Sequence, residues 1–289
     1  MTQYNFNIRK LEDKVLIDVN NWKQPSGTME IHRLSGRSHV TFITEVLYTG
    51  SKEVSKDDVV LLSSTACSIA TSPTSPYEIG DGKKYFNIPI SQVMGIFENA
   101  DISFKSLKLQ KGKVLFKKVQ RNQNSNLVVQ DKSATVGGIV KVSEESQFSV
   151  GDLIAVQDNV STQVYLDGIE YYCIEENMIV AILTESLSLN EGKFINKYIL
   201  MKPYISNKVL NSTLLETPNI NYEDLDYSDI NNRDLFIVYF VDNSLSNIKR
   251  EDILLLNRDY TNYFYYDNEK YFILDGEKWV SGKIIERKE

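Results

Sequence analysis

The segment SVGDLIAV, residues 149–156, decides the fold, because it joins a polar turn to an apolar strand. Gly and Asp favour tight turns, and the four residues that follow Asp152 are all apolar. Residues 56–62, KDDVVLL, and residues 249–256, KREDILLL, have the same pattern. In each segment a turn ends in Asp and a strand begins at the next residue. The chain therefore contains three copies of one turn-and-strand unit.

A tyrosine follows each of these aspartates and supports the repeat. The interval from Asp to Tyr is 19 residues in the second and third copies and 27 in the first, where an insertion is expected at 68–76. Both landmarks shift by 100 residues between the second and third copies, which indicates a structural repeat. The pairs are Asp58 and Tyr85, Asp152 and Tyr171, and Asp252 and Tyr271.

Short apolar segments separated by Gly, Asn, Asp and Ser run through the whole chain, which predicts an all-β fold. Helical turns are expected only near 91–95 and 175–178. The predicted strands include Val59–Leu62, Lys113–Lys118, Leu153–Val156, 235–241 and 253–256.

We predict three tandem modules, at residues 1–100, 101–190 and 191–289, the third being the most diverged. Each begins with an apolar strand and continues with a long polar segment before its second strand. These polar segments are 20–39, 119–136 and 205–234. Long structureless segments within a compact domain are usually functional or disordered, so their recurrence makes them candidate functional loops.

The overall composition excludes several classes of protein. The 289 residues carry 32 Lys+Arg and 39 Asp+Glu, a net charge of −7, with 42% apolar residues. This acidity argues against nucleic acid as the main partner. No apolar run approaches the roughly 20 residues of a membrane-spanning helix. The N-terminal MTQYNFNIRK lacks the apolar core of a signal peptide, so we expect a protein that is not secreted.

Residues that carry enzymatic or metal chemistry are few. Two cysteines, Cys67 and Cys173, are too few for a disulfide framework and are expected to be buried thiols. Two histidines, His32 and His39, lie seven residues apart without a third ligand nearby. No nucleophile elbow, phosphate loop or dinucleotide fingerprint is present. We therefore expect no catalytic residue, no cofactor and no metal.

The second module contains an ordered series of motifs. They are KVLFKK at 113–118, VGGIVKV at 136–142, VGDLI at 150–154, YLDGIEYYCI at 165–174 and NMIVAIL at 177–183. Over nearly the whole chain, this order resembles the GroES-type co-chaperonin family, which has a strand, a mobile loop, a strand ending near Val-Gly-Asp, a hairpin and a closing strand.

The resemblance implies three irregular β-barrels with long loops, in a family that assembles into rings and caps a chaperonin. In such loops a short apolar stretch docks on the partner. Its counterparts here would be Leu127, Val128 and Val129 in the second loop, Met29 and Ile31 in the first, and Leu214 and Leu215 in the third. The alternative is that these residues fold back onto their own barrel.

Two departures from the family bear on function. The segments 51–55, 143–149 and 243–248 are short where the family has the hairpin that roofs its ring. Three fused modules also do not tile a sevenfold ring of single modules. In addition, the first loop is basic, through Arg33 and Arg37, and the third is acidic, so these loops of adjacent copies are expected to pair.

The first hypothesis is a non-enzymatic structural protein of a bacteriophage virion, in a portal, tail or capsid-associated position, held in a large homo-oligomer by its loops. The second is a working co-chaperonin that binds a chaperonin through the apolar loop residues. The third is a sugar-binding β protein that uses the Tyr-rich segment 260–267. The expected location is a virion or the host cytoplasm, with other proteins of the assembly as partners.

Overall fold

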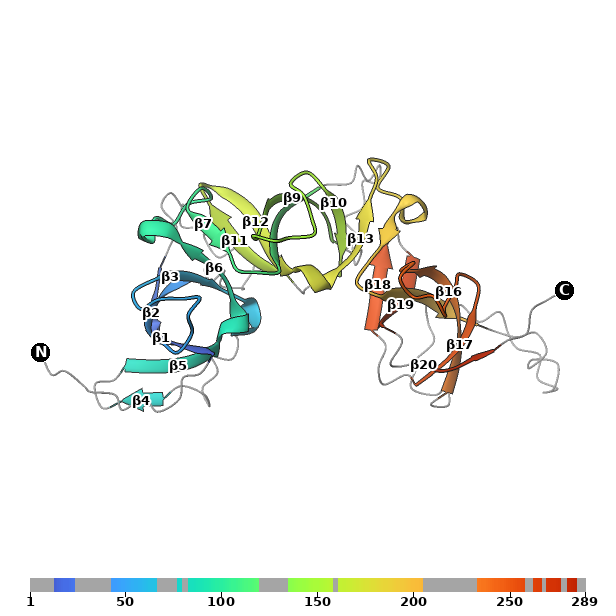
Figure 1. The fold of residues 1–289 in the computed structure, drawn as a ribbon, viewed down its shortest axis with the longest axis horizontal. Coiled ribbons are helices and arrows are strands. Elements are labelled where there is room, and N and C mark those ends of the chain that lie inside the picture. Colours follow the sequence, from blue (N-terminus) through green and yellow to red (C-terminus); the bar gives the residue numbers. More distant parts are fainter. Residues whose placement is uncertain are drawn as a thin grey trace, which may run out of the picture. The chain divides into compact units, whose positions relative to one another are not determined.

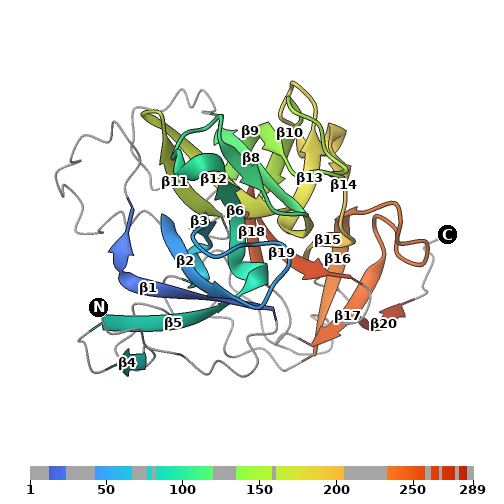
Figure 2. The ribbon, with the colours of Figure 1, turned by 60° about the vertical axis from the view of Figure 1, so that its left-hand side comes forward.

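The computed structural model describes residues 13–23, 43–66, 77–79, 83–119, 135–157, 161–204, 233–257, 262–266, 269–276 and 280–284. These residues form three antiparallel sheets that follow one another along the chain, coloured blue to teal, green to yellow, and orange to red in Figures 1 and 2. The all-β class predicted from the sequence is confirmed. The described helical structure consists of short turns, among them Ile90–Gln92 and Glu176–Met178 near the two predicted positions.

The first sheet has the strand order β4-β5-β1-β2-β3-β6-β7. Its strands are β1 Lys14–Trp22, β2 Ile43–Thr49, β3 Val59–Leu62, β4 Tyr77–Ile79, β5 Lys83–Pro89, β6 Val93–Phe97 and β7 Leu107–Leu109.

The second sheet has the order β11-β12-β8-β9-β10-β13-β14. Its strands are β8 Lys113–Lys118, β9 Thr135–Val142, β10 Leu153–Val156, β11 Thr162–Leu166, β12 Ile169–Glu175, β13 Ile179–Leu183 and β14 Lys193–Phe194.

The third sheet has the order β18-β19-β15-β16-β17-β20. Its strands are β15 Tyr198–Pro203, β16 Arg233–Val241, β17 Ile253–Asn257, β18 Asn262–Tyr266, β19 Glu269–Asp275 and β20 Val280–Ile284.

All three sheets share one topology. The fourth and fifth strands form a hairpin that pairs with the first strand, and the second, third and sixth strands follow in that order across the sheet. They also share two register shifts. In each sheet, one residue of the second strand has no paired residue on the first strand. These residues are Leu47, Val140 and Tyr239. A second shift lies between the third and sixth strands of each sheet. Bulges fix register and bend strands, so their common positions make residues of the three sheets directly comparable.

The Asp landmark of the sequence is a turn of constant geometry before the third strand. Its carboxylate accepts a hydrogen bond from the backbone N–H three residues earlier, which closes the turn. The residue just before the Asp has a positive φ of 70° at Asp57, 101° at Gly151 and 72° at Glu251. The bonded pairs are Ser55 and Asp58 at 2.7 Å, Ser149 and Asp152 at 2.8 Å, and Lys249 and Asp252 at 2.7 Å.

Each turn also carries one buried apolar side chain, four residues before the Asp. These side chains are Val54, Phe148 and Ile248. Val54 packs in the core of the first sheet with Val15, Ile17 and Val60. Ile248 packs in the corresponding core of the third sheet. In the first and third sheets, the short segment before the turn Asp therefore contributes a side chain to the core of its own sheet.

By contacts, the described elements divide into two compact units. One contains β1–β8, β11, β12 and most of β9, and the other contains β10 and β13–β20. The strand β7 pairs with β6 and β14 pairs with β13. The first two sheets therefore extend past residues 100 and 190, where the sequence placed the module boundaries. No helix among the described residues has the length and apolarity needed to cross a membrane.

Candidate assembly interface

The first junction joins the outer face of the first sheet to the β11–β12 hairpin. Side chains from β2, β3 and β6 pack against side chains from β8, β11 and β12 in one buried apolar cluster. We call the first group a strand face and the second a hairpin face. The strand-face members are Ile43, Val59, Leu61, Met94 and Phe97, with Leu107 of β7 beside them; the hairpin-face members are Leu115, Val164, Leu166, Tyr171 and Cys173.

The second junction joins β9, β10, β13 and β14 to the third sheet in the same manner. The strand-face members are Val136, Ala155, Val180, Ala181, Leu183 and Phe194; the hairpin-face members are Leu200, Phe240, Phe264, Tyr266, Tyr271 and Ile273. Gln157 and Tyr266 add hydrogen bonds, from the amide of Gln157 to the Tyr263 carbonyl at 2.9 Å and from the Tyr266 hydroxyl to the Leu187 carbonyl at 2.6 Å.

Strand register shows that equivalent positions meet at both junctions. Leu115 lies opposite Cys173 as Leu200 lies opposite Ile273. Val164 lies opposite Tyr171 as Phe264 lies opposite Tyr271. The chain therefore uses one type of interface twice, with a strand face of one sheet against the hairpin face of the next.

A lysine ties the first junction together. The ammonium of the half-buried Lys141 on β9 donates to the carbonyls of Phe104 at 2.5 Å and Leu107 at 2.8 Å, and lies 4.6 Å from the centre of the Phe104 ring. That ring stacks on Tyr171 at 5.1 Å. Burial lowers the pKa of Lys141, while the carboxylate of Glu98 partly opposes this shift. The segment between β6 and β8 is thereby fixed to the second sheet.

Further polar contacts and a buried thiol lie at the first junction. Lys113 donates to Glu175 at 2.5 Å and to the Ser91 carbonyl at 3.2 Å. Cys173 is buried, and this desolvation raises the pKa of its thiol to about 12. A thiol with this pKa is protonated at neutral pH, which agrees with the buried, unreactive thiol expected from the sequence.

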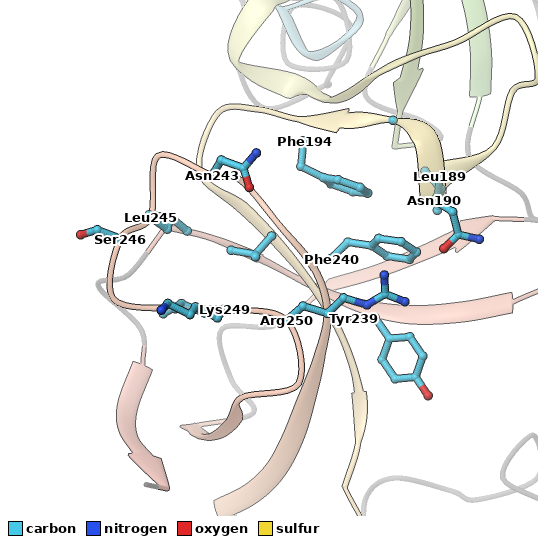
Figure 3. A pocket seen from close by; sticks show the side chains of 13 residues that line it. Leu189, Asn190, Phe194, Tyr239, Phe240, Asn243, Leu245, Ser246, Lys249 and Arg250 are labelled. Carbon is cyan, nitrogen blue, oxygen red and sulfur yellow. The ribbon is translucent and has the colours of Figure 1, made fainter. Parts of the chain in front are cut away.

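An aromatic stack occupies the equivalent place at the second junction. Phe240 has the register position of Lys141, since each lies opposite the leucine of the first strand. Its ring stacks on Phe194 at 5.0 Å with an interplanar angle of 14°. A cavity of about 420 Å³ opens beside this pair (Figure 3).

The first and third sheets each retain one face of the same type outside these clusters. On the first sheet, Tyr85 and Asn87 have the register positions of Tyr171 and Cys173, and neither belongs to a core cluster of described residues. On the third sheet, Ile253 has the position of Val59 and is likewise outside the described clusters. The face on the first sheet is a hairpin face, and the face on the third sheet is a strand face.

Tyr48 of the first sheet is more exposed than the residue at the same position of the third sheet. It is equivalent to Lys141 and Phe240, and its side chain is 38% exposed whereas that of Phe240 is 9% exposed. Lys56 lies over the Tyr48 ring at 5.8 Å, and Arg250 lies over the Phe240 ring at 5.6 Å. The same cation–aromatic pair therefore occurs at the hairpin faces of the first and the third sheet.

The Tyr-rich segment contributes to the second junction through β18. Phe264 and Tyr266 are 1% exposed within that cluster, whereas Tyr263 is 38% exposed. The ammonium of Lys270 lies 3.9 Å from the centre of the Tyr263 ring. This ring face is occupied by a side chain of the protein.

The partner-binding residues predicted from the sequence lie outside the described residues. They are Leu127, Val128, Val129, Met29, Ile31, Leu214, Leu215, Arg33 and Arg37. Cys67 and both histidines also lie outside. Among the described residues, no three His, Cys, Asp or Glu side chains come together in a possible metal site. The junction faces were not predicted, although the unbroken apolar run of β3 is a sequence signal for them.

No protein-family model matches the chain, and no curated protein matches it. The functional argument therefore rests on the geometry of the two junctions.

Proposed function

We propose that the protein is a non-enzymatic structural component of a large assembly, in which copies join head to tail through co-chaperonin-like β modules. A bacteriophage virion, as a portal, tail or capsid-associated component, is the proposed setting. One observation carries the proposal: a strand face meets a hairpin face at both junctions within the chain. The first sheet has a further hairpin face and the third a further strand face, so a second copy offers the complement of each.

The sequence of the third sheet supports a covered outer face. A sheet with one face in solvent alternates apolar and polar residues. β3 and β10 do not alternate, and the alternate side chains that point away from their own core pack at the junctions. β17 has a comparable apolar run at 253–256, in which Leu254 and Leu256 pack in its own core. A partner over the other side of β17 accounts for this run.

A contact between unlike faces is heterologous. Such contacts produce closed rings when the rotation between copies closes, and open filaments when it does not. The predicted contacts of the long loops, including Arg33 and Arg37 with the acidic third loop, would add to this interface.

Native mass measurement with two face variants tests the proposal. Ile253→Glu places a charge on the strand face of the third sheet, and Tyr85→Glu places one on the hairpin face of the first sheet. We expect the wild-type chain to form oligomers and each variant alone to be monomeric. An equimolar mixture should form dimers only, because each variant retains the face that the other has lost. A monomeric wild type, or a mixture that stays monomeric while both variants are folded, would contradict the proposal.

Equivalent residues inside the chain provide the control. Val59→Glu and Tyr171→Glu change the same positions at the first junction, where both side chains are buried. We expect these variants to lose stability, because a charge is then buried without a partner. Ile253→Glu and Tyr85→Glu should each melt at a higher temperature than Val59→Glu and Tyr171→Glu, because they do not disturb a junction within the chain.

The co-chaperonin hypothesis depends on loop residues that the structure does not describe. Its test is capture of the wild-type chain by a purified chaperonin with nucleotide, compared with Val128→Asp. Capture that Val128→Asp abolishes would favour a co-chaperonin over the structural role.

A further inference from the structure

The cavity beside Phe194 and Phe240 has the dimensions and lining of a ligand site. Its volume of about 420 Å³ lies within the range of roughly 300–1,000 Å³ that ligand pockets occupy. Phe194 and Phe240 supply stacked rings, and Leu245 and Ile248 supply a buried apolar wall. An apolar or aromatic group of a ligand therefore has a surface to pack on.

Cationic and amide groups surround this apolar floor. The exposed side chains of Asn190, Asn243, Lys249 and Arg250 line the cavity, and Figure 3 shows them around the two phenylalanine rings. Neither Lys249 nor Arg250 forms an ion pair with a carboxylate of the described residues. The amide groups add hydrogen-bond donors and acceptors. The rim therefore favours a carboxylate placed next to the apolar group.

Only the third sheet has two cations at these positions. Lys249 and Arg250, three and two residues before the turn Asp, correspond to Ser55 and Lys56 in the first sheet and to Ser149 and Val150 in the second. The turn uses the backbone of residue 249, whose N–H donates to the Asp252 carboxylate and whose carbonyl accepts from the Asp252 N–H. The two side chains therefore have no part in closing the turn. The guanidinium of Arg250 lies 5.6 Å from the centre of the Phe240 ring, which places this cation beside the aromatic floor of the cavity.

We propose that this cavity binds a peptide segment in which an aromatic side chain stands beside an acidic one. The ring packs against Phe194 and Phe240, and the carboxylate is bound by Arg250, with Lys249 and the two amides beside it. A neutral or a purely apolar segment lacks the second interaction. The proposal does not depend on head-to-tail assembly, because every residue of the cavity belongs to one chain.

A titration with small peptides tests the proposal on the full chain. The probe is N-acetyl-Phe-Asp-amide, and methyl-selective NMR follows Leu189, Leu245 and Ile248. We expect saturable shifts at these methyl groups with a Kd of roughly 0.1–1 mM, from the usual efficiency of small ligands. N-acetyl-Phe-Asn-amide and N-acetyl-Ala-Asp-amide should each bind about tenfold more weakly, because each lacks one of the two interactions.

Matched variants separate the site from general charge attraction. Arg250→Met should weaken probe binding about tenfold, while Arg250→Lys should retain most of it. Lys56→Met removes the equivalent cation of the first sheet, beside Tyr48, and should leave binding unchanged. Equal binding of the Asp and Asn probes, shifts spread over the whole surface, or full binding by a folded Arg250→Met variant would overturn the proposal.

Discussion

The two junctions join equivalent faces with different chemistry. At the first, the Lys141 ammonium binds the carbonyls of the segment that enters the second sheet. At the second junction, Phe240 has the same register position as Lys141. Its ring stacks on that of Phe194, which lies in the segment leading into the third sheet. The apolar faces around them are alike. The interface type therefore belongs to the shared topology, whereas the residue at this central position varies from junction to junction.

This difference changes what surrounds each junction. A lysine that reaches backbone carbonyls fixes the connecting segment closely, because those carbonyls would otherwise need another donor. A pair of aromatic rings has no such requirement. At the second junction the rings leave a cavity with an open rim.

The largest expected effect comes from removing the aromatic stack. Phe240→Ala should lower the free energy of unfolding of the third sheet by about 3–4 kcal/mol, the usual cost of deleting a buried phenylalanine. Hydrogen exchange of the β15 and β16 amides measures this loss locally. Tyr48→Ala, at the exposed equivalent position, should cost less than about 1 kcal/mol. Equal losses would show that burial at the junction does not distinguish the two positions.

A smaller effect is expected at the first junction. Lys141→Met leaves the carbonyls of Phe104 and Leu107 without their donor, and should cost about 1–2 kcal/mol in hydrogen exchange of the β8 and β9 amides. Lys111→Met removes a fully exposed ion pair with Glu145 and should leave the same amides unchanged.

The pH dependence of Lys141 has a defined sign. Because burial lowers its folded-state pKa below the ordinary 10.5, the unfolded chain binds more protons between those two values. The contribution of this group to stability is therefore present above pH 10.5 and is lost as pH falls through the folded pKa. The stability difference between wild type and Lys141→Met should be larger at pH 10 than at pH 8. A difference that is the same at both values would contradict burial of the cation.

The smallest perturbation uses Cys173 as a reporter of the first junction. In a Cys67→Ser background, its buried thiol, with a pKa near 12, should react with a disulfide reagent at pH 8 far more slowly than in urea. Lys141→Met should speed this reaction by loosening the junction, and Phe240→Ala should not. Rapid labelling of the native chain would place Cys173 outside a closed junction.

The strands and their turns were predictable because the determinants are local. The apolar runs at Val59–Leu62, Lys113–Lys118 and Leu153–Val156 coincide with β3, β8 and β10. Asp closes its own turn through a hydrogen bond within three residues of sequence, so it marks the following strand reliably. The all-β class followed from this pattern.

The junctions were not predicted, because strand alternation shows which face is apolar but not which segment covers it. Lys141 illustrates the limit. Within a strand sequence, it reads as a solvent-facing residue, and its acceptors lie more than thirty residues earlier at Phe104 and Leu107. The Tyr-rich segment contains the strand β18, in which Phe264 and Tyr266 are buried while Tyr263 is exposed.

The unlike residues at position 141 and position 240 also bear on how the chain folds correctly. Three similar sheets in one chain create a risk that a hairpin docks on the wrong neighbour, a common misfolding route of repeat proteins. If the third hairpin docked on the first strand face, Phe240 would meet carbonyls that require a donor. If the second hairpin docked in place of the third, Lys141 would be placed against Phe194. Each wrong pairing loses its central contact, so the divergence of these two residues discriminates against domain swapping.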